Sequence, residues 1–109
     1  MERDLKKIIN GKRYNTVTAT RIAHYDNGLG YSDFSNCNET LFLTPKSAWF
    51  TVGSGGPMSR YARPSGNNAT TGSDDVFMLL TADEAREWLE RHGETDELEE
   101  HFADSIEDA

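Results

Sequence analysis

The sequence contains a single cysteine, Cys37, and therefore cannot form an internal disulfide. Its fold must rest on an apolar core, and 109 residues are enough for one domain without disulfide or metal links. An unpaired cysteine is typical of a reducing compartment, so we expect a cytoplasmic protein. A nucleophilic role for Cys37 would require a nearby base, and we interpret it as an ordinary small residue near a strand.

Long hydrophobic runs are also missing. No apolar segment approaches the roughly 20 residues that cross a membrane. Residues 2–4 are charged and no apolar segment of a signal peptide follows them, so we expect no secretion signal. Two matches to the glycosylation sequon, at 38–40 and 68–70, are interpreted as chance because nothing indicates secretion.

Signatures of catalysis, of metal binding and of nucleotide binding are absent as well. The three histidines lie far apart in the sequence and lack the spacing of paired metal ligands. The glycine-rich segment 53–56 matches neither Gly-x-Gly-x-x-Gly nor a terminal Gly-Lys-Ser/Thr. We therefore expect no catalytic residue, no cofactor and no metal. An enzyme is the third reading, which a ligand bound at 53–56 beside Arg60 would favour.

Positive charge is scarce at one end of the chain. The net charge is −8 overall, but residues 81–109 carry 12 acidic and two basic side chains, whereas residues 1–80 carry seven acidic and nine basic. An acidic arm of this kind repels nucleic acid and membrane surfaces and attracts basic protein surfaces. The alternative is a solvated helix face that only aids solubility.

A smaller basic patch lies near the start of the chain. Its residues are Lys6, Lys7, Lys12 and Arg13, with the aromatic Tyr14 beside them. Basic side chains next to an aromatic ring are typical of proteins that bind single-stranded nucleic acid. Because the acidic arm opposes such binding, we expect neither direct nucleic-acid binding nor membrane binding.

The pattern of apolar residues centres on the stretch 39–56. Two runs rich in β-branched and aromatic residues flank Pro45-Lys46-Ser47, which predicts a β-hairpin. In the first run, Leu41 and Leu43 alternate with Phe42. Only one face of each strand can meet the main core, so Phe42 or Trp49 must cover a second, smaller apolar patch.

Local signals predict the remaining strands and loops. Asn10-Gly11 is a strong signal for a type I′ hairpin turn. We predict further strands over 6–9, 12–14, 21–25 and 75–80. The last is apolar from Val76 to Leu80 and is predicted to be a central strand. We also expect a turn at 53–57, a short helix at 58–62 after Pro57, a long loop over 63–73, and Phe34 anchored in the core.

Two helices are predicted at the acidic end. Thr81 and Glu84 form a capping box that begins the first, which runs to about His92 and is ended by Gly93. Its inner face contains Ala85, Trp88, Leu89 and His92. We expect Trp88 to be buried between helix and sheet, next to Leu41 or Leu43.

The second predicted helix is capped by Thr95 and is acidic except for one apolar stripe. The stripe contains Leu98, Phe102 and Ile106, and something must cover it. It can fold back on the second face of the sheet near Phe42, or pair with its twin in a homodimer. Repulsion between two acidic arms favours the monomer.

These signals together predict an α+β fold. We expect an antiparallel β-sheet of four to six strands packed against one amphipathic helix, with an acidic C-terminal helix. The chain is expected to form a single domain over 1–109. Residues 1–7 would be a frayed leader, 8–80 mainly β, and 81–109 the acidic helical segment.

Several motifs between Ile8 and His92 resemble those of one known family. They include Ile-Asn-Gly-Lys-Arg-Tyr-Asn-Thr at 9–16 and Gly-Gly-Pro-Met-Ser-Arg-Tyr-Ala at 55–62, with shorter matches at 18–19, 25–28, 39–42, 49–50, 80–81, 84–85 and 88–89. The sequence resembles a family of small mobile-element (phage and plasmid) bacterial proteins, mostly uncharacterised, that is similar to anti-CRISPR proteins. It departs from that pattern at Ser47, where a turn glycine is expected, and at Ser54, where a glutamate is expected.

The resemblance implies a non-enzymatic anti-CRISPR-type inhibitor acting in the cytoplasm of a bacterial host. Its partner would be a basic, nucleic-acid-handling surface of a Cas effector, with the Cas9 type favoured because it holds its heteroduplex in a positively charged channel. The acidic arm supplies carboxylates that would mimic nucleic-acid charge. They are Glu94, Glu97, Glu99, Glu100, Asp104, Glu107 and Asp108. The alternative is a mobile-element regulatory protein-binding module with no CRISPR target, which would recognise its partner through the loops 26–33 and 66–73.

Overall fold

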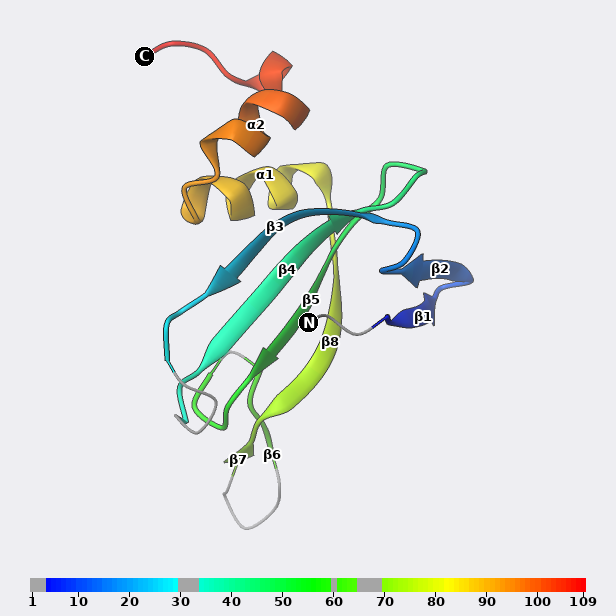
Figure 1. Ribbon diagram of the computed structural model, residues 1–109, viewed down its shortest axis with the longest axis vertical. Helices are drawn as coiled ribbons and strands as arrows, with labels where there is room; N and C mark the ends of the chain where they lie inside the picture. Colours follow the sequence, from blue (N-terminus) through cyan, green and yellow to red (C-terminus); the bar gives the residue numbers. More distant parts are fainter. Residues whose placement is uncertain (1–3, 30–33, 60, 65–69) are drawn as a thin grey trace.

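The computed structural model describes residues 4–29, 34–59, 61–64 and 70–109. Its main element is a four-stranded antiparallel sheet in the order β3-β4-β5-β8 (Figure 1). The strands are β3 (Thr20–Asp26), β4 (Cys37–Leu43), β5 (Trp49–Gly55) and β8 (Ser73–Leu80). Two short hairpins flank it, β1 (Lys6–Ile9) with β2 (Lys12–Asn15), and β6 (Arg63–Pro64) with β7 (Thr70–Thr71).

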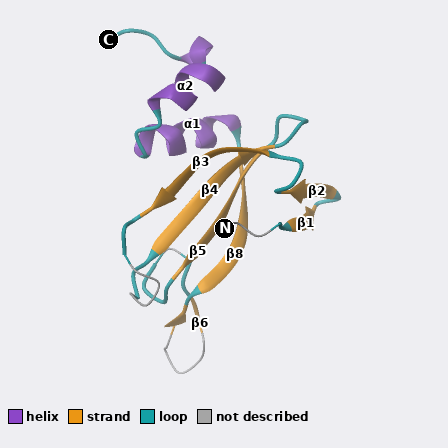
Figure 2. Ribbon diagram, viewed as in Figure 1, coloured by secondary structure: helices purple, strands orange, loops and turns teal. Residues whose placement is uncertain are grey.

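The helices follow the sheet in the chain and gather at one end of the molecule (Figure 2). They are α1 (Ala82–Arg91), α2 (Thr95–His101) and a 3-10 turn, η1 (Ala103–Ser105). The strands come first along the chain and the helices last, which is typical of the α+β class. The predicted fold class is therefore confirmed.

One face of the sheet meets α1. Leu41 of β4 and Ala85 and Leu89 of α1 are completely buried in one apolar cluster, together with Trp49 and Trp88. We call this the helix-side core. Trp88 is 2% exposed and shares this cluster with Leu41, so the predicted burial of Trp88 between helix and sheet is confirmed.

The opposite face of the sheet meets the β1–β2 hairpin. Tyr14 of β2 packs edge-on against Phe50, with ring centroids 5.5 Å apart. Phe50 also stacks on Phe42 at 5.1 Å and on Phe77 at 5.6 Å. The second apolar patch therefore contains Phe42, whereas Trp49 lies in the helix-side core, as the alternation along the central hairpin required.

The tight turns use residues with positive φ. Asn10 and Gly11 have φ of 52° and 76°, which fits the predicted type I′ turn between β1 and β2. Ser47, between β4 and β5, has φ of 66°. This is a left-handed conformation that glycine adopts without strain, which explains why a glycine suits this position better.

Several predictions about the middle of the chain are wrong. Phe34 is 64% exposed and does not anchor in the core. Strand β8 lies at the edge of the sheet rather than at its centre. The segment after Pro57 forms turns, with Ser59 N donating to Gly56 O and Ala62 N donating to Ser59 O, rather than a short helix.

Gly53 and Gly55 belong to β5 instead of a turn, and close packing explains why they are glycines. A Cβ atom on Gly53 would lie 2.1 Å from the Tyr61 hydroxyl, and one on Gly55 would lie 2.1 Å from Ser59 Oγ. The chain after Pro57 thus folds back over the end of β5, where only glycine leaves room for it. The predicted 63–73 loop also contains the β6–β7 pairing, and residues 65–69 lie outside the described part.

The acidic end follows the prediction through α1 and then departs from it. The capping box between Thr81 and Glu84 is present, α1 ends at Arg91, and Gly93 has φ of 69°. The N-cap of α2 is Glu94 rather than Thr95, and the helix ends at His101. The chain runs on through η1 into an extended segment, so the predicted helical stripe stops before Ile106.

The stripe is covered within the chain, but on the same side as α1. Phe102 stacks on Trp49 at a centroid distance of 5.3 Å, and Leu98 also packs against the helix-side core. Ile106 remains 45% exposed. The alternative site near Phe42, on the opposite face of the sheet, is therefore wrong.

Candidate functional sites

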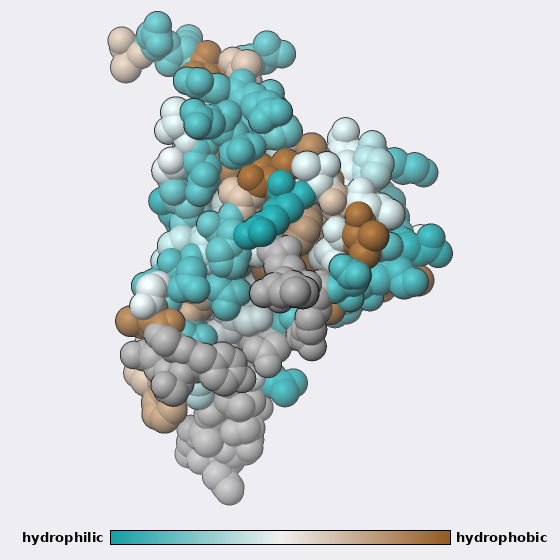
Figure 3. All heavy atoms as spheres, in the orientation of Figure 1, coloured by the Kyte–Doolittle hydropathy of each residue, from teal (hydrophilic) through white to brown (hydrophobic). Residues whose placement is uncertain are grey.

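The structure brings the seven predicted partner-binding carboxylates to one end of the molecule. Glu94 caps α2, three lie within α2, Asp104 lies in η1, and Glu107 and Asp108 follow in the extended segment. Five of the seven are exposed, and Glu94 and Glu97 are half-buried. Hydrophilic residues dominate this helical end in the space-filling view (Figure 3).

The first helix extends this acidic surface. Asp83, Glu84, Glu87 and Glu90 of α1 are all exposed. Only part of this charge is balanced locally, since Arg86 Nε lies 3.8 Å from Glu90 Oε1. We call the carboxylates of α1, of α2 with its N-cap Glu94, of η1 and of the segment 106–109 the acidic end. The seven predicted residues are one part of it, and the acids of α1 were not among them.

One group on α2 has the composition of a metal site. Donor atoms of Glu97, Glu100 and His101 all lie within 4.8 Å of one another. His101 Nε2 is 3.7 Å from Glu97 Oε2 and 3.9 Å from Glu100 Oε2. Neighbouring side chains on a helix make such contacts without an ion, so this geometry alone assigns no metal.

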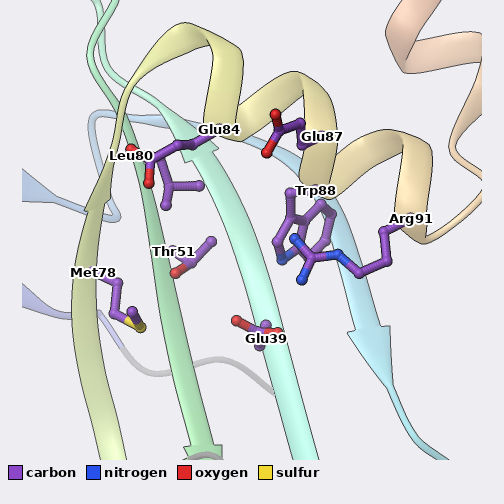
Figure 4. Close-up of a pocket in the computed structure, with 8 residues that line it drawn as sticks. All are labelled: Glu39, Thr51, Met78, Leu80, Glu84, Glu87, Trp88 and Arg91. Carbon is purple, nitrogen blue, oxygen red and sulfur yellow. The ribbon is translucent and has the colours of Figure 1, made fainter.

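A cavity of about 140 Å³ lies between α1 and the sheet. Figure 4 shows the side chains around it. The sheet contributes Glu39, Thr51, Met78 and Leu80, and α1 contributes Glu84, Glu87, Trp88 and Arg91. We call it the α1 cavity.

Glu39 is the least expected residue in this wall. It points to the same face of β4 as Leu41, and it is only 3% exposed. The Tyr61 hydroxyl donates to Glu39 Oε2 at 2.5 Å, which is a short bond typical of a charged acceptor. The sequence does indicate that Glu39 is buried, because it lies two and four residues before Leu41 and Leu43 and so shares the apolar face of their strand.

Trp88 and Thr51 supply the other buried polar groups of the cavity. Thr51 is 1% exposed. Trp88 Nε1 is buried and has no hydrogen-bond partner among the residues that the structure describes. The indole ring extends from α1 toward the sheet, and the guanidinium of Arg91 overlaps it in this view (Figure 4). An indole N–H can only donate, so this position lacks an acceptor.

A second, larger cavity lies on the basic side of the molecule. Its volume is about 490 Å³, and its walls come from the β1–β2 hairpin and the turn between β4 and β5. Lys12, Arg13 and Lys46 line it and are exposed, with the buried Tyr14 beside them. The predicted basic patch therefore gains Lys46, and it lies on a different side of the molecule from the helices (Figure 1).

Two predicted sites fall partly outside the described residues. These are the loops 26–33 and 66–73, of which 30–33 and 66–69 are not described, together with Arg60. Within the described ranges, no helix is long and apolar enough to cross a membrane. Comparison of the chain with models of protein families, with curated proteins and with solved structures finds no match.

Proposed function

We propose that this protein is a non-enzymatic, anti-CRISPR-type inhibitor that binds a basic, nucleic-acid-handling surface of a Cas effector in the bacterial cytoplasm. The resemblance of residues 8–92 motivates the choice of effector. The single observation that carries the binding mode is the acidic end, where exposed carboxylates from two helices and the following segment lie together.

The separation of charge supports this binding mode. The acidic end and the basic hairpin occupy different sides of the molecule, so the positive side chains do not neutralise the carboxylates across a shared surface (Figure 1). A nucleic-acid channel attracts phosphates through fixed Lys and Arg side chains. Carboxylates at the acidic end would occupy the same side chains in place of phosphates.

We expect a single copy of this chain to bind the partner. Leu98 and Phe102 already pack against the helix-side core, so most of the apolar stripe needs no second copy to cover it. We therefore propose that the protein acts as a monomer. We also expect it not to bind nucleic acid or membranes directly.

Two matched variants test the contribution of the acidic end. Glu100→Gln with Asp104→Asn removes two exposed carboxylates there, and Asp4→Asn with Asp26→Asn removes two exposed carboxylates elsewhere. Exposed ion pairs contribute about 0.2–1 kcal/mol each, so the first pair should weaken binding roughly 2- to 30-fold. The second should leave the affinity close to that of the wild type.

The measurement is the dissociation constant for purified Cas effectors, Cas9 types first, at low and high salt. Binding through exposed carboxylates weakens as salt rises, because ions screen the charges. A dissociation constant that does not change with salt would refute the charge mechanism. An equal loss of affinity in both variant pairs would refute it as well. Binding of the wild type to none of the effectors would refute the choice of partner and favour the regulatory module without a CRISPR target.

A further inference from the structure

The larger cavity, between the β1–β2 hairpin and the turn that joins β4 to β5, lies away from the proposed partner surface. We call it the basic cavity. We propose that it binds a small organic diphosphate, such as a nucleoside diphosphate. The phosphate oxygens would accept from the basic side chains of the wall, and the organic group would lie on its less polar part. This inference does not depend on the function proposed above.

The charged side chains of the basic cavity are all positive. Lys12, Arg13 and Lys46 line it, and no acidic side chain is among the described residues of its wall. Within the part of the chain that the structure describes, none of these three cations forms an ion pair. The chain has 11 basic and 19 acidic side chains, so three cations gathered without a carboxylate favour an anion from outside.

Neutral polar groups of the wall also have protons left to donate. Thr44 Oγ1 accepts from Ala48 N at 2.9 Å, so the hydroxyl proton of Thr44 remains for a ligand. Asn15 Oδ1 accepts from Val17 N at 2.9 Å, so the amide nitrogen of Asn15 also remains. Ionised phosphate oxygens are strong acceptors, and they therefore match a wall of donors.

The number of cations sets the charge of the ligand. One phosphate group carries a charge of about −1.5 to −2 at pH 7, which is less than the three cations of the wall. Two linked phosphates carry more and come closer to balancing them. Lys12 and Arg13 lie on β2, whereas Lys46 lies between β4 and β5, so a diphosphate would bridge the two sides of the cavity.

The volume of the basic cavity leaves room for an organic group beside the phosphates. At about 490 Å³, it lies within the roughly 300–1,000 Å³ of pockets that bind small organic ligands. Tyr14, Pro45 and Ala48 also line it and give it an apolar part. A sugar or a base attached to the diphosphate would cover these residues, whereas free pyrophosphate would leave them in contact with water.

The net charge of −8 does not oppose an anion at this place. The acidic end lies on a different side of the molecule, whose longest dimension is 49 Å (Figure 1). At physiological salt, interactions between exposed charges are largely screened beyond about 8 Å. The field inside the basic cavity therefore comes mainly from its own wall.

The experiment is a titration of the full chain followed by two-dimensional ¹⁵N–¹H NMR at about 0.15 M salt. The probes are ADP, pyrophosphate and adenosine, which separate the diphosphate from the organic group. ADP should shift the backbone signals of Gly11 and Ala48, which line the cavity, and leave that of Gly93, between α1 and α2, nearly unchanged. Pyrophosphate should bind more weakly than ADP, and adenosine should bind most weakly.

Two matched double variants locate the site. Lys12→Gln with Lys46→Gln removes two cations of the wall, and Lys6→Gln with Arg63→Gln removes two exposed cations outside it. One exposed ion pair changes an affinity roughly 1.4- to 5-fold, so the first variant should bind ADP roughly 2- to 30-fold more weakly. The second should bind ADP about as tightly as the wild type.

Four results would overturn the inference. If ADP shifts neither Gly11 nor Ala48, or if both double variants weaken ADP equally, the basic cavity is not the site. Adenosine that binds as tightly as ADP would contradict the role of the diphosphate. Pyrophosphate that binds as tightly as ADP would contradict the contact with an organic group. A short thymidine oligonucleotide that binds more tightly than ADP would show that this surface recognises nucleic acid instead.

Discussion

Replacing Gly53 by alanine should destabilise the fold more than any other single methyl group added to β5. Gly53 lies opposite Glu39 in the register of β4 and β5, and the ring of Tyr61 lies over it. A Cβ at this position would be 2.1 Å from Tyr61 Oη and 2.2 Å from its Cζ, against 3.4–4 Å for ordinary contact. Tyr61 is 5% exposed, so its ring has little room to move.

Two terms make up the expected loss of stability. Forcing a methyl group into a packed site costs about 1–3 kcal/mol. Moving the ring also breaks the hydrogen bond from the Tyr61 hydroxyl to Glu39, and bonds to charged groups contribute about 1.5–3 kcal/mol. The sum is about 2.5–6 kcal/mol, a large part of the roughly 5–15 kcal/mol that stabilises a typical domain.

Urea denaturation of four proteins tests this reasoning. They are the wild type, Gly53→Ala, Tyr61→Ala and the double variant. Once the ring is gone, the added methyl group meets little, so Gly53→Ala should cost less than about 1 kcal/mol in the Tyr61→Ala background. If Gly53→Ala is as stable as the wild type, Tyr61 does not pack on Gly53. The same conclusion follows if Gly53→Ala lowers the free energy of unfolding equally in both backgrounds.

Two further predictions concern the helical end. Trp88→Ala removes a buried aromatic side chain and should lower the free energy of unfolding by about 3–5 kcal/mol. Unchanged stability in denaturant would show that α1 does not pack on the sheet. Phe102→Ala removes a half-buried ring that stacks on Trp49 and should cost about 1.5–2.5 kcal/mol, roughly half the cost of a fully buried phenylalanine. Ile106→Ala should change stability by less than about 0.5 kcal/mol because Ile106 is exposed. Similar losses for these last two variants would contradict the docking of α2.

The elements that were predicted correctly are those whose signals are local. Asn10-Gly11 tolerates positive φ at two successive positions, which fixes the first hairpin without help from distant residues. The capping box of α1 joins residues three apart and is equally local. The assignment of Phe42 and Trp49 to different faces follows from the period of a strand.

The errors occur where contacts distant in the sequence decide the structure. Gly53 and Gly55 resemble a turn in the sequence, but they extend β5 because Tyr61 and Ser59 pack against them. Strand β8 is apolar because it contributes to both cores, with Phe77 on one face and Leu80 on the other, although it lies at an edge. Neither fact can be read from a short window of sequence.

The candidate sites divide in the same way. The acidic end could be predicted, since charge depends only on composition and the helices gather their residues at one end. The bend after His101 could not, because Phe102 leaves the helix to stack on Trp49. The α1 cavity was not predicted at all, since it depends on how far α1 lies from the strands beneath it.

Glu39 links the cavity to the glycines of β5. A buried carboxylate requires a donor, and Tyr61 supplies one from a segment 22 residues further along the chain. Tyr61 reaches Glu39 only because the position opposite Glu39 is Gly53, where a side chain would exclude the ring. These three residues therefore depend on one another. Glu39 also lines the α1 cavity, so the packing of Tyr61 over β5 fixes one wall of that cavity.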